Sequence, residues 1–469
     1  MYERTRHDVA WLVTLWTAAL VALSFSLSHS HAAASGIPGA RFGYEQGSVV
    51  LANPTALAYN PGALAFSGTQ LFLDVSLAVR QFSWTHPRGL GDAPEPAGFE
   101  GANYGTAKAL TVGAGPQMAA SFQLGKLVLG AGYYVPYGGG TLSFDRNERF
   151  ANTMYPGAAD GVSRWHGYDG ASTVLFGVLG AAIRIGPLGI GAVGNIIYSS
   201  YSISRAQNSP IDGNDLTQEQ RVYLDADTIN GSFGLGVLYE AMAEQLWLAF
   251  SYQAQPGLGS MAFEGRYTLD PTIGVDGPTR VQDVTLHQAL PDVFRLGARW
   301  RPSPELELRF TAEHTRWSLS QTQCLGLRDK PCLVKRDGGA AANSGVIRVL
   351  RRHWNDALAV RAGVSYWVLP ELELFAGLGY ENAAVPDSTL EPLVADSDVV
   401  SGALGARFRI GQTWFIAASY NHLEYLTRDN IGRSELAAPN IQTTSRSVDG
   451  GGIYKQRWGV INANLAKTF

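Results

Sequence analysis

The sequence predicts an all-β protein, a transmembrane antiparallel β-barrel of about 14 strands with a small N-terminal segment inside it. Three observations predict this fold. Segments of about ten residues alternate between apolar and polar side chains. Charged residues are only 16 % of the 469-residue chain, against roughly a quarter in average proteins. Short turns alternate along the chain with long polar connections, which is typical of outer-membrane barrels.

The alternation is clearest in "PELELRFTAEH" (304–314), where Leu306 and Leu308 share one face and Glu305 and Glu307 share the other. The same period of two recurs in 246–252, 292–302, 358–366, 371–380 and 403–411. A soluble β-sandwich would alternate in the same way, with its apolar faces turned inward. The pattern therefore predicts strands, and other features must choose between sandwich and membrane barrel.

Length and aromatic placement favour the membrane. Many of these strands reach ten residues, whereas strands of globular proteins average about 5–6. Aromatic residues gather at strand ends, as at a membrane–water interface: Tyr252, Trp300, Tyr366, Trp367, Tyr380, Tyr420 and Tyr425. The chain ends in Phe469 after an alternating strand, although Lys467 interrupts the pattern. A terminal aromatic of this kind is similar to the assembly signal of bacterial outer-membrane barrels.

Turns and connections differ strongly in length. "RPSPE" (301–305) and "LPE" (369–371) are short, whereas 143–170, 269–289 and 321–344 are long and polar. Short turns at one end and long loops at the other are expected of a barrel over residues 69–469. A closed barrel also leaves no unpaired edge in lipid.

Residues 35–68 do not continue the strand pattern. The segment is rich in Gly and Pro and contains "AYNPGALAFSG" (58–68), in which Asn60-Pro61-Gly62 interrupts apolar residues. It is too hydrophobic for a free tail. We expect a compact segment packed inside the barrel.

Residues 1–34 have the features of a secretory signal peptide. Arg4 and Arg6 precede the apolar stretch 11–28, and "AAA" (32–34) offers small residues for cleavage. The alternative is a retained N-terminal anchor helix.

Cys324 and Cys332 are the only two cysteines, and they flank the polar segment "LGLRDKP". In an exported protein they are expected to form a disulfide that closes a loop, and the alternative is two free thiols.

Several classes of function lack the residues they need. The formal net charge is −4 with no basic block, which argues against nucleic-acid binding. "GIGAVG" (189–194) is followed by β-branched and aromatic residues, which predicts strand glycines and no dinucleotide site. No His pair has metal-binding spacing, and no G-x-S-x-G turn supports a hydrolase. The sequence therefore predicts a non-enzyme without cofactor or metal.

Four segments, taken in order, resemble the FadL-type outer-membrane transporters for long-chain fatty acids and related hydrophobic compounds. They are "ANPTALAYNPGALAFSGTQ" (52–70), "GAGYYVPYGGG" (130–140), 290–318 and 354–387. Gly62 stands where the family usually has Ala, Lys467 departs from its C-terminal pattern, and 200–285 is only weakly similar.

This resemblance implies a barrel plugged by a hatch at 35–68, a hydrophobic ligand held in an internal apolar pocket, and a lateral exit through a kinked strand. The hatch turn would be Asn60, Pro61, Gly62, Ala63 and Leu64, and the kink would fall at Pro136, Tyr137 and Gly138. Expected partners are the ligand, outer-membrane lipid and, during biogenesis, the barrel assembly machinery; the protein is expected to be a monomer.

Arginines that are expected to face the lumen give a hypothesis about how a ligand is bound. Arg295, Arg299 and Arg361 lie on polar strand faces, where they would contact a ligand carboxylate. The simpler interpretation is ion pairing with Glu305, Glu307 and Glu371 across the lumen. The favoured function is passive uptake of hydrophobic small molecules; the alternatives are a general diffusion porin and, less favoured, a lipid-modifying enzyme.

Overall fold

The structure is a computed structural model. It describes residues 48–88, 98–138, 141–146, 159–208, 219–270, 279–335, 341–342, 344–436 and 448–469. The predicted signal peptide (1–34) and the first part of the 35–68 segment lie outside the described residues.

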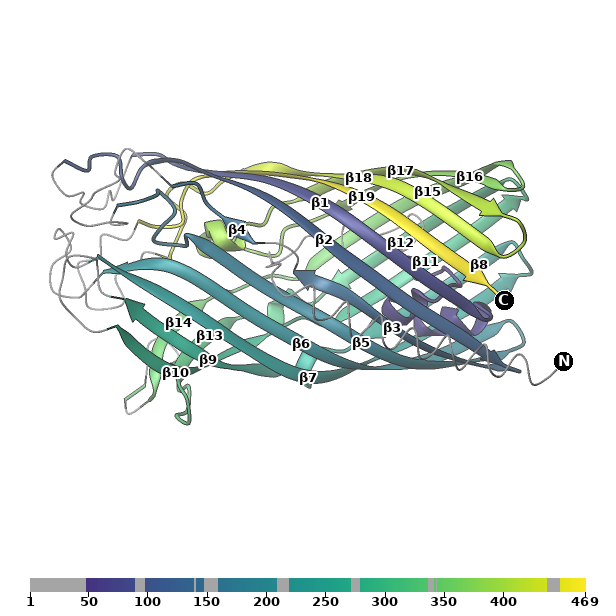
Figure 1. Cartoon of the computed structure of the whole chain (residues 1–469), viewed down its shortest axis with the longest axis horizontal. Helices are drawn as coiled ribbons and strands as arrows, with labels where there is room; N and C mark the ends of the chain where they lie inside the picture. Colours follow the sequence, from purple (N-terminus) through teal and green to yellow (C-terminus); the bar gives the residue numbers. More distant parts are fainter. Residues whose placement is uncertain are drawn as a thin grey trace.

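A closed antiparallel barrel of 14 strands forms the wall (Figure 1), which confirms the predicted fold and strand count. In wall order the strands are β1 (Gln70–His86), β2 (Gly105–Leu124), β3 (Leu127–Gly138), β5 (Asp169–Ile185), β6 (Leu188–Asn208), β7 (Glu219–Met242), β8 (Leu246–Gln253), β11 (Val293–Ser303), β12 (Leu306–Thr315), β15 (Ala357–Leu369), β16 (Leu372–Glu381), β17 (Val399–Ile410), β18 (Trp414–Asp429) and β19 (Ile453–Thr468). The register from Gln70↔Thr468 to Thr85↔Ile453 closes β1 on β19. Phe469 extends this closure, because its N–H donates to the carbonyl of Thr69 at 3.0 Å.

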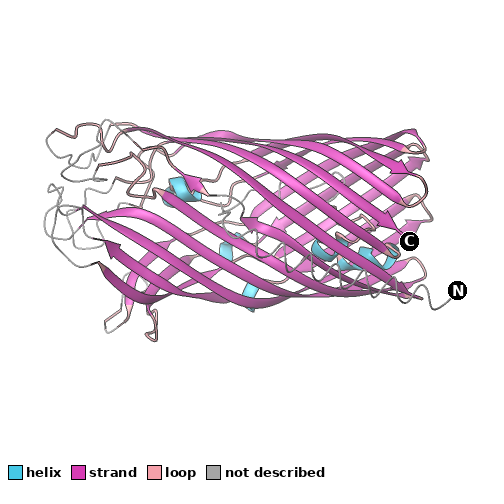
Figure 2. Cartoon of the chain, viewed as in Figure 1, coloured by secondary structure: helices cyan, strands magenta, loops and turns pink. Residues whose placement is uncertain are grey.

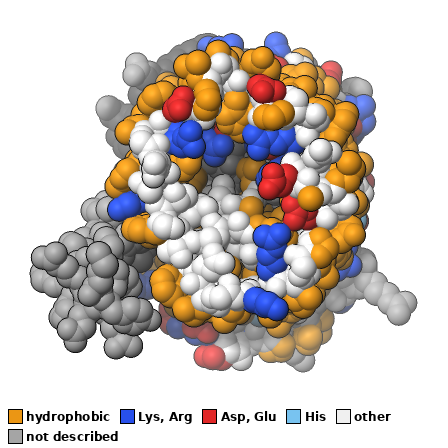
Figure 3. All heavy atoms as spheres, turned by 90° about the vertical axis from the view of Figure 1, so that its right-hand side faces the viewer, with side chains coloured by type: hydrophobic (Ala, Val, Ile, Leu, Met, Phe, Trp, Pro, Cys, Tyr) orange, Lys and Arg blue, Asp and Glu red, His pale blue; other side chains and the backbone are white. Residues whose placement is uncertain are grey.

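Exposure alternates along each strand and shows which face meets lipid. On β1, Val75 and Leu77 are 48 % and 45 % exposed, whereas Asp74 and Ser76 are 0 % and 1 % exposed. Viewed from the short-turn end, hydrophobic side chains surround the ring and charged side chains gather inside it (Figure 3). This is the reverse of a soluble sandwich, so the barrel presents its apolar face to the membrane.

A smaller sheet extends the wall at the long-loop end. The upper part of β7 pairs with β9 (Ser260–Asp270), and the ladder continues through β10 (Arg280–Ala289) and β13 (Thr322–Leu327) to β14 (Val346–Arg351). The sequence analysis expected long connections at 269–289 and 321–344, where the structure has β10 and β13. Strands β10 and β13 gain a ladder there because β9 continues the sheet from β7, a pairing that local sequence does not show.

Short helical turns lie mostly inside the barrel (Figure 2). They are α3 (Ala56–Tyr59), η1 (Pro61–Phe66), η4 (Pro256–Leu258), η5 (Trp317–Leu319), η6 (Asp387–Thr389), η7 (Pro392–Val394); β4 (Leu142–Ser143) is a short strand paired with β5. Within the described part of the chain, every helix is too short to cross a membrane.

Cys324 on β13 is joined to Cys332 by a disulfide, which closes the end of the β13 strand onto the connection that follows. Closing a loop this short restricts the unfolded chain by about 2–3 kcal/mol in the chain-entropy model. We predict that reduction, or the Cys324→Ser/Cys332→Ser double variant, speeds proteolysis within 322–351 severalfold. The barrel, whose ladders do not include this bond, keeps its heat-modifiable migration on gels. Limited proteolysis followed by mass spectrometry measures the first effect; unchanged cleavage would contradict it.

Candidate functional site

The described part of the N-terminal segment, residues 48–68 (the inner segment), lies inside the barrel near its short-turn end. Its helices α3 and η1 contact the inner faces of β3, β5, β6, β7 and β8. In Figure 1 they are the purple coils close to the C-terminus. The inner segment therefore covers one side of the lumen.

Asn60 fixes the bend between the two helices. Its backbone is extended, with φ −159° and ψ 96°, and Pro61 begins η1, where its missing N–H costs nothing. The Asn60 side-chain oxygen accepts from Gly62 N–H at 3.0 Å. Its amide nitrogen donates to the Val49 carbonyl at 2.7 Å and to the Val237 carbonyl of β7 at 3.0 Å. Asn60 is fully buried, so it ties the inner segment to itself and to the wall.

Wall glycines make room for this bend. A Cβ at Gly62 would lie 2.6 Å from the Gly236 carbonyl oxygen, and a Cβ at Gly236 would overlap the Asn60 side chain. On β6, a Cβ at Gly189 or Gly191 would overlap the backbone of the turn. The 189–194 motif is thus part of a strand, as predicted, and its first two glycines admit the inner segment. The close approach of backbones explains why Gly fits at position 62.

Leucines of the inner segment fill the wall beside this turn. A Cβ at Gly130 of β3 would lie 3.0 Å from Leu57 Cδ2 and 3.1 Å from Leu64 Cδ2. Both leucines are about 2 % exposed or less and belong to one apolar cluster with residues of β3, β5, β6 and β8. Opposite them, Ser251 of β8 donates its hydroxyl to the Tyr59 carbonyl at 2.6 Å. The contact is apolar toward β3 and β5 and hydrogen-bonded toward β7 and β8.

The ladder between β2 and β3 is shorter than either strand. It runs only from Leu124↔Leu127 to Met118↔Tyr133, whereas β2 stays paired with β1 up to Gly105. Strand β3 continues along β5 to Gly138, with a register shift between Tyr134 and Tyr137. The wall thus changes partners at this point, and the shift falls within one or two residues of the predicted kink.

The inner segment lies directly behind the end of that ladder. A Cβ at Gly132, which pairs with Ala119, would lie 3.3 Å from Leu57 Cδ1 and 3.2 Å from the Ala119 side chain. Leu57 therefore lies inside the barrel beside Ala119↔Gly132, the pair next to the end of the β2–β3 ladder.

Ion pairs line the opposite side of the lumen. Arg299 contacts Glu307 at 3.3 Å, Arg295 contacts Glu313 at 2.5 Å, and Arg361 contacts Glu381 at 2.8 Å. Further pairs join Arg309 to Glu307, Arg407 to Glu373 and Arg409 to Glu371. These charges come from β11, β12 and β15 to β17, and Figure 3 shows charged side chains around a hollow. Of the expected partners, Glu307 and Glu371 pair with arginines, and Glu313 and Glu381 were not foreseen.

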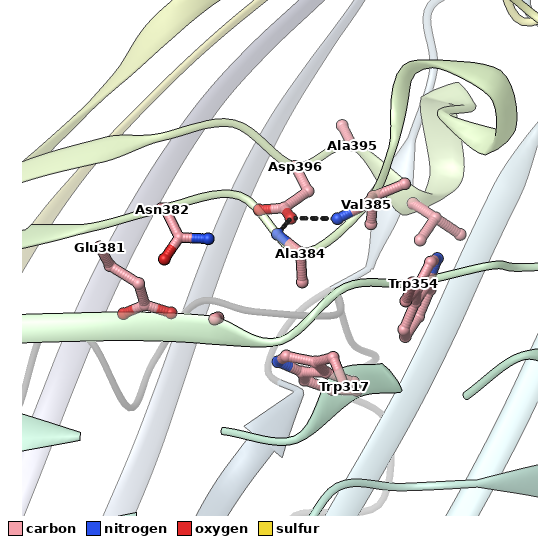
Figure 4. A pocket seen from close by; sticks show the side chains of 10 residues that line it. Trp317, Trp354, Glu381, Asn382, Ala384, Val385, Ala395 and Asp396 are labelled. Carbon is pink, nitrogen blue, oxygen red and sulfur yellow. Dashed lines mark hydrogen bonds between the residues drawn. The ribbon is translucent and has the colours of Figure 1, made fainter. Parts of the chain in front are cut away.

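A small cavity lies closer to the long-loop end of the barrel, between η5, η7 and the connection after β16 (Figure 4). Its volume is about 20 Å³, which is room for one water molecule. Trp317 and Trp354 form its aromatic side and pack edge to face with ring centroids 5.1 Å apart. Asp396 accepts from the N–H groups of Ala384 and Val385 at 2.6 and 3.0 Å, while burial raises the pKa of its carboxyl. Sequence analysis missed this site because its residues come from four distant segments.

The connection that carries η6 and η7, residues 382–398, is anchored by a buried charge pair. Glu391 contacts Arg352 at 2.6 Å and His166 at 3.6 Å. Burial alone would raise the pKa of Glu391, but Arg352 and His166 outweigh it and lower the pKa to about 2. Arg352 is only 2 % exposed and also donates to Gln323. This pair holds the connection inside the barrel mouth.

An antiparallel barrel with an apolar exterior, a polar interior and an internal N-terminal segment defines a membrane channel or transporter of the β-barrel class. Residues 179–445, more than half of the chain, match the family described as outer membrane protein transport protein (OMPP1/FadL/TodX). The chain belongs to this family and is an integral protein of the outer membrane, as the sequence predicted. The family consists of transport proteins.

Solved structures of similar fold agree. A Pseudomonas aeruginosa FadL homologue aligns with a TM-score of 0.72 at 15 % identity, covering 94 % of this chain and 100 % of that one. The Pseudomonas putida toluene transporter TodX aligns at 0.58 and 15 %, covering 90 % and 95 %. The Ralstonia pickettii toluene transporter TbuX aligns at 0.56 and 15 %, covering 89 % and 94 %. No curated protein matches the chain.

Gly191→Val tests the seat of the inner segment. The added side chain would overlap Pro61, and overpacking of this kind typically costs 1–3 kcal/mol. We expect at least tenfold faster amide hydrogen exchange in residues 48–68, while the barrel retains heat-modifiable migration. Gly194→Val, three residues away on the same strand and with nothing within 4 Å of its Cβ, is the matched control. Equal exchange in the two variants would contradict the seat.

Glu391→Gln tests the anchor of residues 382–398. It leaves the Arg352 charge buried without its carboxylate, which typically costs 3–5 kcal/mol, so we expect the connection to become protease-sensitive at pH 7. Because the Glu391 pKa is lowered from 4.5 to about 2, its stabilisation is complete above about pH 4.5 and lost as the pH falls toward 2. The wild-type connection should therefore become sensitive to protease only as the pH falls from about 4.5 toward 2. Glu435→Gln, at an exposed neighbouring carboxylate, is the control.

Proposed function

We propose that this protein mediates passive uptake of hydrophobic small molecules across the outer membrane, through an internal apolar path and a lateral exit between β2 and β3. The observation that carries the proposal is the end of the β2–β3 ladder at Met118↔Tyr133, with Leu57 behind it. An opening at this level leads to the lipid and not to the periplasm. The inner segment, as a hatch, would shift away from β3 to connect the lumen with that exit.

Hydrophobic ligands gain from such a route. Each CH₂ group removed from water contributes about 0.8 kcal/mol, so an apolar ligand favours a path that stays apolar and ends in the bilayer. The similar structures include a FadL homologue and toluene transporters, which supports long-chain fatty acids or aromatic hydrocarbons as the two ligand classes to test.

The lumen arginines bear on the choice between these classes. In the proposed path a ligand carboxylate would contact Arg295, Arg299 or Arg361. It would then compete with Glu313, Glu307 and Glu381, which already pair with these arginines. Neutral hydrocarbons meet no such competition, so uptake of both classes should be compared.

The barrel fold also bears on how the protein is assembled and on its oligomeric state. Phe469, which is 61 % exposed and bonded to Thr69, would be the residue that the barrel assembly machinery recognises. A barrel whose apolar surface is entirely covered by outer-membrane lipid would function as a monomer.

A bulky group at the proposed exit should block uptake. Ala114 is exposed on β2, above the end of the ladder, and becomes the only free thiol in Ala114→Cys because both native cysteines are bonded. We expect alkylation of this variant with a bulky maleimide to slow uptake of labelled oleate or toluene into proteoliposomes at least fivefold. Ala418→Cys, also exposed and lying on β18, three strands from β2 along the wall, is the control and should be unaffected.

The outcomes separate transport from route. Unchanged uptake after complete labelling of Ala114→Cys would contradict the lateral exit. Uptake no faster than in protein-free liposomes would contradict transport altogether. Steady ion conductance in planar bilayers, together with uptake of polar solutes, would support the diffusion porin instead.

A further inference from the structure

The outer surface of the barrel changes character toward the long-loop end of β1. Leu77 and Val79 are 45 % and 37 % exposed, and the next outward positions are Gln81 and Ser83. The apolar band therefore ends between Val79 and Gln81, at the level where lipid headgroups begin.

Three cations gather at this level on the strands that flank β1. Ser83 is opposite Lys108 of β2 and Lys455 of β19, and Gln81 is opposite Arg457 of β19. All three cations are exposed. Because neighbouring strands lie about 4.8 Å apart and residues rise about 3.3 Å along a strand, their Cα atoms fall within roughly 12 Å of one another. We refer to Lys108, Lys455 and Arg457 as the cationic triad.

The triad lines an open groove of about 780 Å³, whose lining includes the exposed Leu110 and the buried Phe82. Leu110, which is 67 % exposed, is the accessible apolar residue of the groove, whereas Phe144 is buried against Phe82 beneath it. Arg457 is oriented by a hydrogen bond from its Nε to the Gln81 side-chain oxygen at 2.7 Å. The groove thus combines a cationic rim with an apolar floor.

Two carboxylates also line the groove, and Glu424 lies opposite Arg457 in the β18–β19 register. Asp145 accepts from the backbone N–H of Lys108 at 2.6 Å, and Glu424 contacts His422 at 3.2 Å. Across the described ranges of the chain, no triad member forms an ion pair. By contrast, on β9 and the turn after β13, Glu264 and Arg328 pair with each other at 4.0 Å.

We propose that the cationic triad binds the phosphate groups of a phosphorylated glycolipid in the outer leaflet of the outer membrane. The apolar part of the groove and the band below it accept the upper acyl chains of the same molecule. Arginine and lysine donate charge-assisted hydrogen bonds to phosphate oxygens, and each such cation near an anionic surface raises the affinity about fivefold. This site is independent of the transport path.

Binding of bisphosphorylated lipid A to the detergent-solubilised full chain tests the site. Microscale thermophoresis should give a dissociation constant at least tenfold weaker for Lys108→Gln/Lys455→Gln/Arg457→Gln than for wild type. Lys126→Gln, which removes an exposed cation at the short-turn end, is the matched control and should bind as wild type. Heat-modifiable migration verifies that each variant is folded.

Two further probes identify the ligand chemistry. Fully dephosphorylated lipid A should bind wild type no better than bisphosphorylated lipid A binds the triple variant, and inorganic phosphate alone should bind at least a hundredfold more weakly than the lipid. Equal binding of the phosphorylated and dephosphorylated lipids would overturn the phosphate contact. Phosphate binding as tight as that of the lipid would overturn the lipid assignment, and a triple variant that binds as wild type would overturn the site.

Discussion

The absence of water in the hydrocarbon layer is the constraint on which this structure depends. Every backbone N–H and C=O there needs a partner in the protein, so the sheet closes on itself through the sixteen-pair register of β1 with β19. Any interruption of a ladder must be covered by something else. The β2–β3 ladder stops at Met118↔Tyr133, and at that level the inner segment packs its leucines against the wall from inside. The inner segment therefore covers the wall from inside at the place where the β2–β3 ladder is interrupted.

Close approach of two backbones is the second element of this arrangement. The turn at Asn60 comes near enough to β6 and β7 that a single methyl group at Gly189, Gly191 or Gly236 would overlap it. A segment held by side chains alone could adjust to such a change, whereas one held backbone to backbone cannot. The Asn60 side-chain amide also fixes the orientation of the turn, because it donates to one carbonyl of the inner segment and to one carbonyl of the wall. The seat is specific for one position of the inner segment.

The sequence allowed prediction of the barrel because each strand carries its period of two locally. It also allowed the position of the Asn60 turn to be recognised, since Pro61 and Gly62 have few other uses in an apolar context. It did not show what the glycines at 189 and 191 are for, because their partner lies more than a hundred residues earlier. The same limit applies to Arg295 and Arg361, which pair with Glu313 and Glu381, and to β9, β10 and β13, whose ladder depends on non-local pairing. Period and turn chemistry are local properties, whereas register and close approach are not.

Two kinds of contact line the lumen, apolar packing and ion pairs. Against β3 and β5 to β8 the inner segment supplies apolar contact, and against β11, β12 and β15 to β17 long Arg and Glu side chains supply ion pairs. The start of the inner segment reaches the charged strands: a Cβ at Gly297 of β11 would lie 2.3 Å from Val49, and the Ser48 hydroxyl lies 3.4 Å from the Thr311 hydroxyl of β12. Over the rest of this half the ion pairs stabilise the wall, because the buried carboxylates of Glu307, Glu313 and Glu373 each meet a guanidinium. An apolar ligand that reaches this level of the lumen gains apolar contact beside the inner segment and not beside the ion pairs. The same division that keeps the wall stable therefore directs such a ligand toward the inner segment and the end of the β2–β3 ladder.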